Sequence, residues 1–188
     1  MADQRYTGVA IALHWLMAGL IVAGFGLGLS MVDLPLSPTK LQWYSWHKWI
    51  GVSVFGLAVL RLCWRLFKAP PPLPASVPRW QHTVSKATHL VLYALMLATP
   101  VLGWLFSSAK GVATVYLGLW RLPDVVAKDE TFAVVLKNAH MALAYLLATL
   151  IVLHIAAALK HHFIDRDTVL ARMFPFVRIK RYSRGISA

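Results

Sequence analysis

Long stretches without a single charged residue constrain this chain more than any other feature of its sequence. Residues 6–32 form a run of 27 uncharged positions, residues 87–109 a run of 23, and residues 138–159 a run of 22. A helix needs about 20 apolar residues to cross the hydrocarbon core of a bilayer, where an open chain satisfies its backbone hydrogen bonds only as a helix. Each run is therefore predicted to be a transmembrane helix.

A fourth apolar stretch, residues 43–67, carries the charged residues Lys48 and Arg61 toward its ends. Both side chains are long enough to reach the head groups while the helix crosses the membrane. The four stretches predict an all-α membrane protein in which one domain, residues 1–188, forms a four-transmembrane-helix bundle. We expect helices at about 9–32, 43–67, 82–107 and 132–160, followed by a basic tail over 161–188.

Composition and charge agree with this fold class. Hydrophobic residues make up 59% of the chain and charged residues 14%, against about 45–50% and about 25% in soluble domains. A net charge of +12 suggests nucleic acid in a soluble protein. Here the charges flank apolar runs, so membrane lipid is the expected partner and nucleic acid is not.

The distribution of positive charge predicts the orientation. Of the 19 Lys and Arg residues, 13 lie in the N-terminus, the second connection and the tail, and 6 lie on the other side. Positive residues accumulate on the cytoplasmic side of membrane proteins. Both termini are therefore expected in the cytoplasm.

Eight histidines stand in this apolar chain, and two of them share the fourth helix. His140 and His154 are 14 residues apart, which at 100° per residue returns to nearly the same helix face. The same interval separates them by roughly 21 Å along the axis. Two imidazoles on one stripe, near opposite ends of one span, are the arrangement that two stacked haems require.

The topology supplies a second ligand for each haem. His14 lies early in the first helix, on the same side as His154, and His47 opens the second helix on the same side as His140. The predicted metal ligands are therefore the pairs His14 with His154 and His47 with His140. Two histidines per iron favour electron transfer over oxygen binding.

Other metal centres fit the pattern less well. Zinc needs three or four ligands at one depth, whereas the histidines form two separated pairs. The chain has no C-x-x-C-H motif and a single cysteine, Cys63, which excludes covalent c-type haem. The expected cofactors are two non-covalent haem b groups.

The sequence resembles the bacterial cytochrome b561 family of small four-helix dihaem cytochromes over nearly its whole length. The fourth-helix ending A-A-A-L-x-H-H and the 14-residue interval before it are specific features of the resemblance. The matching segments are Arg5-Tyr6 with His14-Trp15, Trp46-His47 with Gly51, Thr88-His89-Leu90-Val91, Lys137 with His140, and His154 to His162. The resemblance implies the same four ligands, and it implies a multi-pass protein of the bacterial inner membrane.

Within this family the superoxide oxidase branch is the most similar functional type. The resemblance implies that superoxide is oxidised to oxygen at the periplasmic face and that ubiquinone accepts the electrons. Lys48 beside His47, and Lys137 one turn before His140, are candidate catalytic residues because cations there would concentrate superoxide. The alternative for both lysines is that their side chains extend to the lipid head groups and have no catalytic role.

Three further residues are candidates for cofactor binding. His161 lies seven residues after His154, on the same face, where a quinone head group could dock. His89 is a candidate inner haem ligand, a quinone-pocket residue or a helix-to-helix hydrogen-bonding residue. Arg79, with Arg61, Arg65 and Lys86, is a candidate for holding haem propionates or quinone, the alternative being a topology signal.

Two other functions remain open at this point. One is an electron-transfer subunit that relays electrons from a partner dehydrogenase or hydrogenase to quinone, and the other is a haem-free bundle with structural histidines. The sequence contains no nucleophilic triad, phosphate-binding loop or nucleotide fingerprint, so any redox chemistry belongs to the cofactor.

Overall fold

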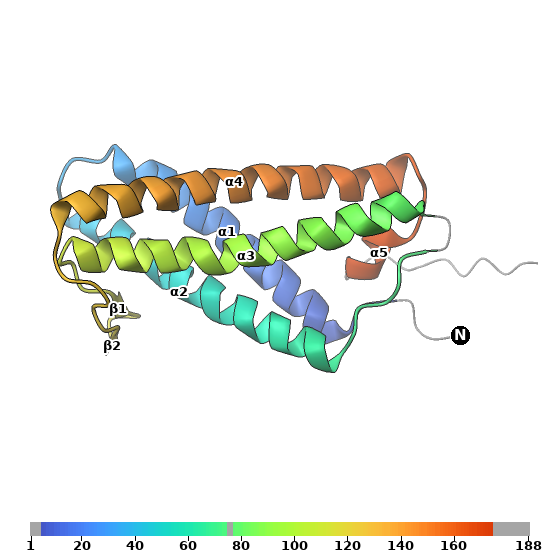
Figure 1. Cartoon of the computed structure of the whole chain (residues 1–188), viewed down its shortest axis with the longest axis horizontal. Coiled ribbons are helices and arrows are strands. Elements are labelled where there is room, and N and C mark those ends of the chain that lie inside the picture. The colour runs from blue at the N-terminus through green and yellow to red at the C-terminus, as the bar shows by residue number, and fades with distance from the viewer. Residues whose placement is uncertain (1–4, 75–76, 175–188) are drawn as a thin grey trace, which may run out of the picture.

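The computed structural model describes residues 5–74 and 77–174 and forms an elongated bundle of four long helices (Figure 1). Each long helix is long and apolar enough to cross a membrane, which confirms the predicted all-α four-helix fold. The remaining elements are a two-stranded hairpin and a short helix. In chain order the elements are α1 (Gly8–Val32), α2 (Pro38–Phe67), α3 (Arg79–Ala109), β1 (Val115–Tyr116), β2 (Trp120–Arg121), α4 (Glu130–Phe163) and α5 (Val169–Met173).

Local capping sets where the helices begin. The Ser37 hydroxyl accepts a hydrogen bond from the Lys40 amide, and Pro38 occupies the first turn of α2. Both residues favour a helix start, so α2 begins before the expected residue 43. In the same way, Asp129 caps α4 by accepting from the Phe132 amide at 2.9 Å.

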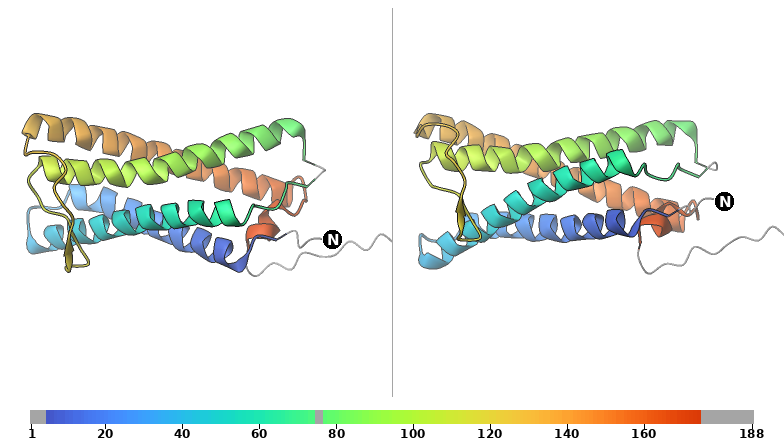
Figure 2. Two further views of the ribbon diagram at one scale, coloured as in Figure 1. Left: turned by 60° about the horizontal axis from the view of Figure 1, so that its bottom comes forward. Right: turned by 90° about the horizontal axis from the view of Figure 1, so that it is seen from below.

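The two ends of the bundle differ in character (Figure 2). The loop end holds the connections 33–37 and 110–129. The terminal end holds residues 5–7, residues 68–74 and 77–78 of the second connection, and residues 164–174. The first and last described residues therefore lie at one end, where the Arg5 guanidinium donates to the carbonyl of Phe174 at 2.6 Å.

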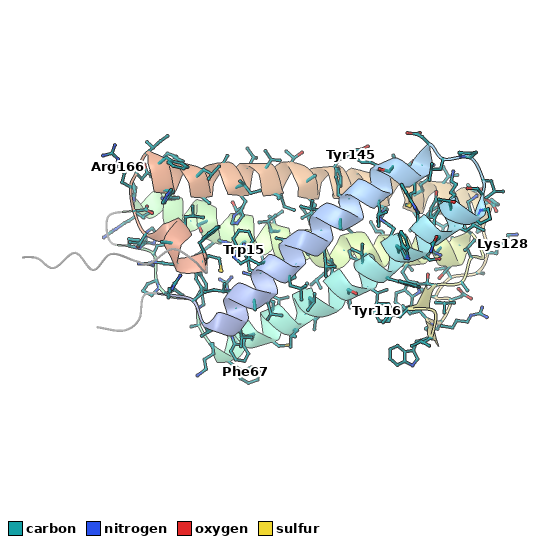
Figure 3. The ribbon with its side chains drawn as sticks, turned by 180° about the vertical axis from the view of Figure 1, so that it is seen from behind. Trp15, Phe67, Tyr116, Lys128, Tyr145 and Arg166 are labelled. Carbon is teal, nitrogen blue, oxygen red and sulfur yellow. The ribbon has the colours of Figure 1, made fainter. Side chains whose placement is uncertain are left out.

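Most apolar side chains of the long helices face outward rather than into the bundle (Figure 3). In α4, only 6% of the most apolar 18-residue window is buried inside the protein. Val22 and Leu90 are 70% and 71% exposed. An apolar exterior of this extent suits lipid rather than water. The buried core is correspondingly narrow and follows the bundle axis as Met17, Ala58, Leu92, Tyr93, Leu95, Met96 and Leu147.

The long connection at the loop end is ordered by contacts with α2, which the sequence did not reveal. The Trp49 indole donates to the Val115 carbonyl at 2.7 Å, and the hydroxyls of Ser53 and Tyr116 lie 3.0 Å apart. The hairpin turns at Leu117 and Gly118, both at positive φ. These bonds hold Val115 and Tyr116 against the side of α2 (Figure 3).

The segment after α4 folds back onto the terminal end. Residues 161–163 continue α4, and α5 then packs against α4, with its last residue, Met173, bonded to α1. Arg172 is 4% exposed and donates to the Pro72 carbonyl at 2.5 Å, while the Trp15 indole donates to the Met173 carbonyl at 2.9 Å. Part of the expected tail 161–188 is therefore built into the bundle, and its residues 175–188 lie outside the described residues.

Candidate paired-histidine sites

His47 and His140 face each other near the loop end. Their ring centres are 6.0 Å apart and their planes are inclined at 83°. The Nδ1 of His47 lies 2.9 Å from the Gly24 carbonyl, and the Nδ1 of His140 lies 2.9 Å from the Thr99 carbonyl. A carbonyl only accepts, so each Nδ1 carries the proton and each Nε2 keeps a lone pair for a metal.

Two glycines make these ring positions possible. Gly28 lies one turn after Gly24, and a Cβ added there would be 3.2 Å from Cε1 of His47. Gly103 lies one turn after Thr99, and its added Cβ would be 3.1 Å from Cε1 of His140. Each imidazole therefore lies across a helix at a place where the residue one turn beyond its carbonyl partner has no side chain.

Three histidines meet near the terminal end. The ring centres of His14 and His154 are 6.3 Å apart, and those of His89 and His154 are 5.5 Å apart. The Nδ1 of His89 bonds the Ser85 carbonyl at 2.7 Å. His14 differs, because its Nδ1 lies 2.9 Å from the Arg61 guanidinium and must accept from it.

The ring separations fit two imidazoles on opposite sides of one metal. An imidazole nitrogen bonds a first-row metal at about 2.0–2.1 Å, so two such bonds in line place the ring centres roughly 6.2–6.4 Å apart. The pairs His47 with His140 and His14 with His154 lie close to this separation, at 6.0 and 6.3 Å. His89 and His154 are closer, at 5.5 Å.

A zinc centre at either pair lacks further ligands. In the part of the chain that the structure describes, the group of three or more possible ligands is His161, Asp165 and Asp167, outside both pairs. The Lys160 ammonium already lies 2.6 Å from the Asp165 carboxylate in that group, so a metal cation would have to compete with it for this carboxylate. The two pairs thus suit a planar cofactor with two axial positions better than a tetrahedral ion.

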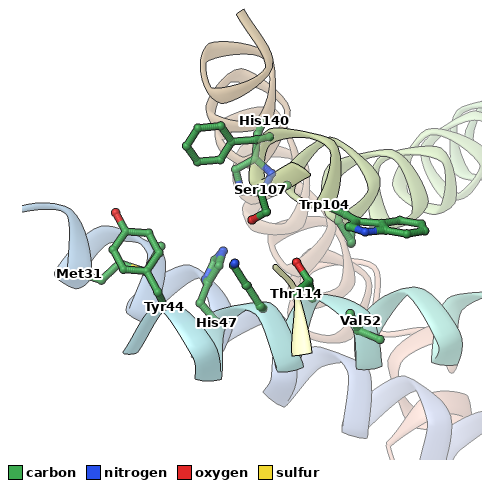
Figure 4. Close-up of a pocket in the computed structure, with 13 residues that line it drawn as sticks. Met31, Tyr44, His47, Val52, Trp104, Ser107, Thr114 and His140 are labelled. Carbon is green, nitrogen blue, oxygen red and sulfur yellow. The ribbon is translucent and has the colours of Figure 1, made fainter. Parts of the chain in front are cut away.

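A pocket opens beside the loop-end pair between α2, α3 and the connection that follows α3 (Figure 4). His47 and His140 line it, together with Lys48, Ser107 and Thr114. Lys137 is exposed on α4 and does not line this pocket. The structure therefore places only one of the two candidate catalytic lysines in the wall of the pocket.

A second pocket opens at the terminal end and is strongly basic. Arg61, Arg65 and Lys68 line it beside His89 and Tyr93, and no described residue in its wall is acidic. Tyr6, which precedes α1, also lines it, and burial raises the pKa of its phenol. That phenol remains a neutral hydrogen-bond donor at neutral pH.

The remaining candidates lie elsewhere at this end. Arg79 is exposed in the first turn of α3 and is not part of the basic pocket. The Nδ1 of His161 lies 2.6 Å from the Asp167 carboxylate, and the other Asp167 oxygen accepts from the Val169 amide at 2.9 Å. Asp167 therefore fixes the ring of His161, a contact made across a turn that the helical spacing of the sequence could not indicate.

Comparison with known proteins gives a consistent family assignment. A family described as prokaryotic cytochrome b561 matches residues 5–176. The chain is 37% identical over 175 residues to cytochrome b561 homolog 2 of Escherichia coli, covering 90% of this chain and 91% of that protein. It is 30% identical to cytochrome b561 homolog 1 of Escherichia coli, over 92% of this chain and 98% of the relative. It is 29% identical to a probable superoxide oxidase CybB of Yersinia pestis, over 92% and 97% respectively.

Proposed function

The chain belongs to the prokaryotic cytochrome b561 family, whose members bind haem b and transfer electrons in bacterial membranes, and from this premise we propose that it is a superoxide:ubiquinone oxidoreductase of the inner membrane. Two superoxide anions each lose one electron and become oxygen. One ubiquinone takes up the two electrons and two protons and becomes ubiquinol. The name of the Yersinia pestis relative, probable superoxide oxidase, supports the choice of substrate.

The observation that carries this proposal is the pair of histidine couples at two depths. His47 with His140, and His14 with His154, would hold two haem b groups, at ring separations of 6.0 and 6.3 Å. When bound, the haems would supply one-electron carriers toward the two faces of the membrane. The Gly24 and Thr99 carbonyls accept from Nδ1 of His47 and His140 and so leave Nε2 of these two rings free to ligate.

The loop end is the proposed periplasmic, superoxide-facing side. Lys48 and Lys137 provide positive charge there, which attracts a small anion over several ångströms. Two other cations at this end are paired with carboxylates, Lys110 with Glu130 and Arg121 with Asp124, and Lys40 donates to the Val32 and Leu34 carbonyls. We assign the attraction of superoxide to Lys48 and Lys137, with Lys40 and Lys128 adding to the positive charge of this end.

The terminal end is the proposed cytoplasmic, quinone-facing side. His161, oriented by Asp167, would donate a proton to a ubiquinone oxygen. Arg61 and Arg65 in the basic pocket are better placed than the exposed Arg79 to pair with haem carboxylates. His89 would border the inner haem and leave His154 to the longer-spaced His14.

The test is superoxide-driven ubiquinone reduction by the purified protein in lipid nanodiscs. Superoxide added as its potassium salt should reduce the haems, seen as the reduced b-type absorption band, and should form ubiquinol with one quinone reduced per two superoxide consumed. Superoxide dismutase should suppress both signals. Haems that remain oxidised under a superoxide pulse but accept electrons from dithionite would contradict the proposal.

The alternative function is a relay subunit that takes electrons from a partner dehydrogenase or hydrogenase. One observation favours it: the hairpin at the loop end presents Leu119 and Trp120 to the outside, 74% and 64% exposed. Exposed apolar groups on a rigid hairpin are typical of partner contacts. Slow haem reduction by superoxide that is indifferent to salt would favour this relay over the oxidase.

A further inference from the structure

We propose that the Lys48 ammonium and the Thr114 hydroxyl form a binding site for an anionic oxygen group in the pocket beside His47 and His140. Two molecules could supply that oxygen group. One is superoxide, in which case the inference rests on the proposed function. The other is haem, through a carboxylate of the group that the same histidines would hold. Both present a small, negatively charged oxygen to the same two donors.

Thr114 supplies the first observation. The residue is 4% exposed, and its Oγ1 is buried without a hydrogen-bond partner among the described residues. A buried hydroxyl of this kind is unfavourable unless something occupies its donor. Thr114 lines the pocket with Ser107, His47 and His140 (Figure 4), so the missing partner is expected in that pocket.

Lys48 supplies the second observation. Its Nζ lies 3.3 Å from the Ala113 carbonyl and 3.5 Å from the Val112 carbonyl, and no described carboxylate lies within ion-pair distance of it. Carbonyls satisfy ammonium donors but do not neutralise the charge. The two acidic residues of this connection are engaged elsewhere: Asp124 pairs with Arg121 at 3.1 Å, and Asp129 caps α4. Lys48 is therefore a cation without a direct ion pair among the described residues, in the wall of a pocket.

The backbone holds the two donors together. Ala113, which accepts from Lys48, is the neighbour of Thr114 in the chain. Trp49 and Ser53 on α2 bind Val115 and Tyr116 at 2.7 and 3.0 Å. Four consecutive residues of the connection, 113–116, are thereby fixed against one face of α2. The donors are in place before a ligand arrives, which favours binding because little conformational freedom is lost.

The donor set specifies the ligand class. An ammonium only donates, and the buried hydroxyl has its donor free. No described acidic residue lines this pocket, so a cation would find no counter-charge, and a neutral molecule would leave the lysine charge unmatched. An oxygen that carries negative charge satisfies both groups.

The experiment uses the purified holoprotein and two variants, Thr114→Val and Lys48→Met. Thr114→Val keeps the shape of the side chain and removes only the hydroxyl. Thr149→Val is the matched control, because Thr149 is exposed on α4 and its hydroxyl bonds the Tyr145 carbonyl. Thr114→Ser and Lys48→Arg restore the hydroxyl and the charge respectively. Circular dichroism establishes that each variant is folded.

Two readouts separate the sources of the anionic oxygen. The first is the rate constant for haem reduction by superoxide in stopped flow, at low and high salt. The second, independent of activity, is the affinity of the haem-depleted protein for haem b relative to haem b dimethyl ester, in which the carboxylates carry no charge. Thr149→Val should match the unmodified protein in both.

If superoxide occupies the site, Thr114→Val should lower the reduction rate about tenfold and leave the preference for haem over its ester unchanged. If a haem carboxylate occupies it, Thr114→Val and Lys48→Met should reduce that preference about tenfold. Unchanged rate and unchanged preference in both variants would overturn the site. An unmodified protein that superoxide does not reduce would instead contradict the proposed function, and the ester comparison would still decide the site.

Discussion

At the scale of single residues, the loop-end pair depends on backbone groups as much as on the histidines. The Gly24 and Thr99 carbonyls select the tautomer of His47 and His140, and Gly28 and Gly103 give the rings room to reach them. Partners of ligating histidines tune both ring orientation and metal affinity. A methyl group placed on either glycine should therefore disturb the site without touching a ligand.

We predict that Gly28→Ala weakens haem binding at the loop-end pair and destabilises the folded protein by about 1–3 kcal/mol. The added Cβ would press on the His47 ring at 3.2 Å. Gly26→Ala is the matched control, because a Cβ there meets nothing within 4 Å and alanine favours helix. The measurement is haem content per chain together with thermal unfolding in detergent. Equal haem content in the two variants would contradict the prediction.

A second prediction concerns which histidine shares the inner iron with His154. His14→Ala should remove the terminal-end haem, and His89→Ala should leave it bound, because only the 6.3 Å separation matches two metal–nitrogen bonds in line. Haem content and the low-temperature b-type spectrum distinguish the two sites. Loss of the inner haem from His89→Ala alone, with the fold retained, would reverse the assignment.

At the scale of elements, the sequence predicted the features that depend on helix periodicity and on the length of apolar runs. The four spans follow from charge-free runs, and the pairing of His14 with His154 and His47 with His140 follows from the depth of each histidine along its helix. The structure brings the two rings of each predicted pair to 6.3 and 6.0 Å between their centres. α2 begins earlier than expected because Ser37 caps it and Pro38 occupies its first turn. The hydrophobic pattern carries no signal for such a cap.

Other parts of the site could not be predicted because they depend on contacts between distant segments. The partners of the histidines are backbone carbonyls, which every residue has. Thr114 is one threonine in a connection, and its burial depends on Trp49 and Ser53 of another element. His89 has three possible roles on the sequence alone, because the sequence does not give its distance from His154, which the structure shows to be 5.5 Å between ring centres.

The turn between α4 and α5 carries the third prediction. His161→Leu should slow ubiquinone reduction by about 100-fold, because it removes the proposed proton donor, while both haem spectra remain intact. Asp167→Asn should slow it less, because His161 keeps its ring but loses the carboxylate at 2.6 Å. His162→Leu is the neighbouring control. The measurement is ubiquinol formation from dithionite-reduced protein, and rates equal to the control would place the quinone elsewhere.

At the scale of the whole molecule, charge and apolar surface together define how the bundle sits in a membrane. Apolar side chains cover the sides of the helices, and the Lys and Arg residues in the described part of the chain divide 9 to 6 between the terminal end and the loop end. This asymmetry predicts that the terminal end faces the cytoplasm.

The fourth prediction tests this orientation in cells. A fluorescent reporter that matures only in the cytoplasm should be bright when fused after residue 188 and dark when inserted in the hairpin between β1 and β2. A reporter enzyme active only in the periplasm should give the opposite pattern. Brightness at the hairpin would invert the assignment of the superoxide and quinone sides.

One helix, α4, contributes an imidazole to each of the two metal pairs, through His140 and His154. A helix is a stiff rod, so a rotation or slide of α4 moves both imidazoles in concert. A displacement of its terminal end, where Lys160 and His161 contact the turn before α5, would thus be transmitted along the helix to His140, roughly 30 Å away. Substitutions that shift α4 as a whole are therefore expected to alter both histidine pairs at once.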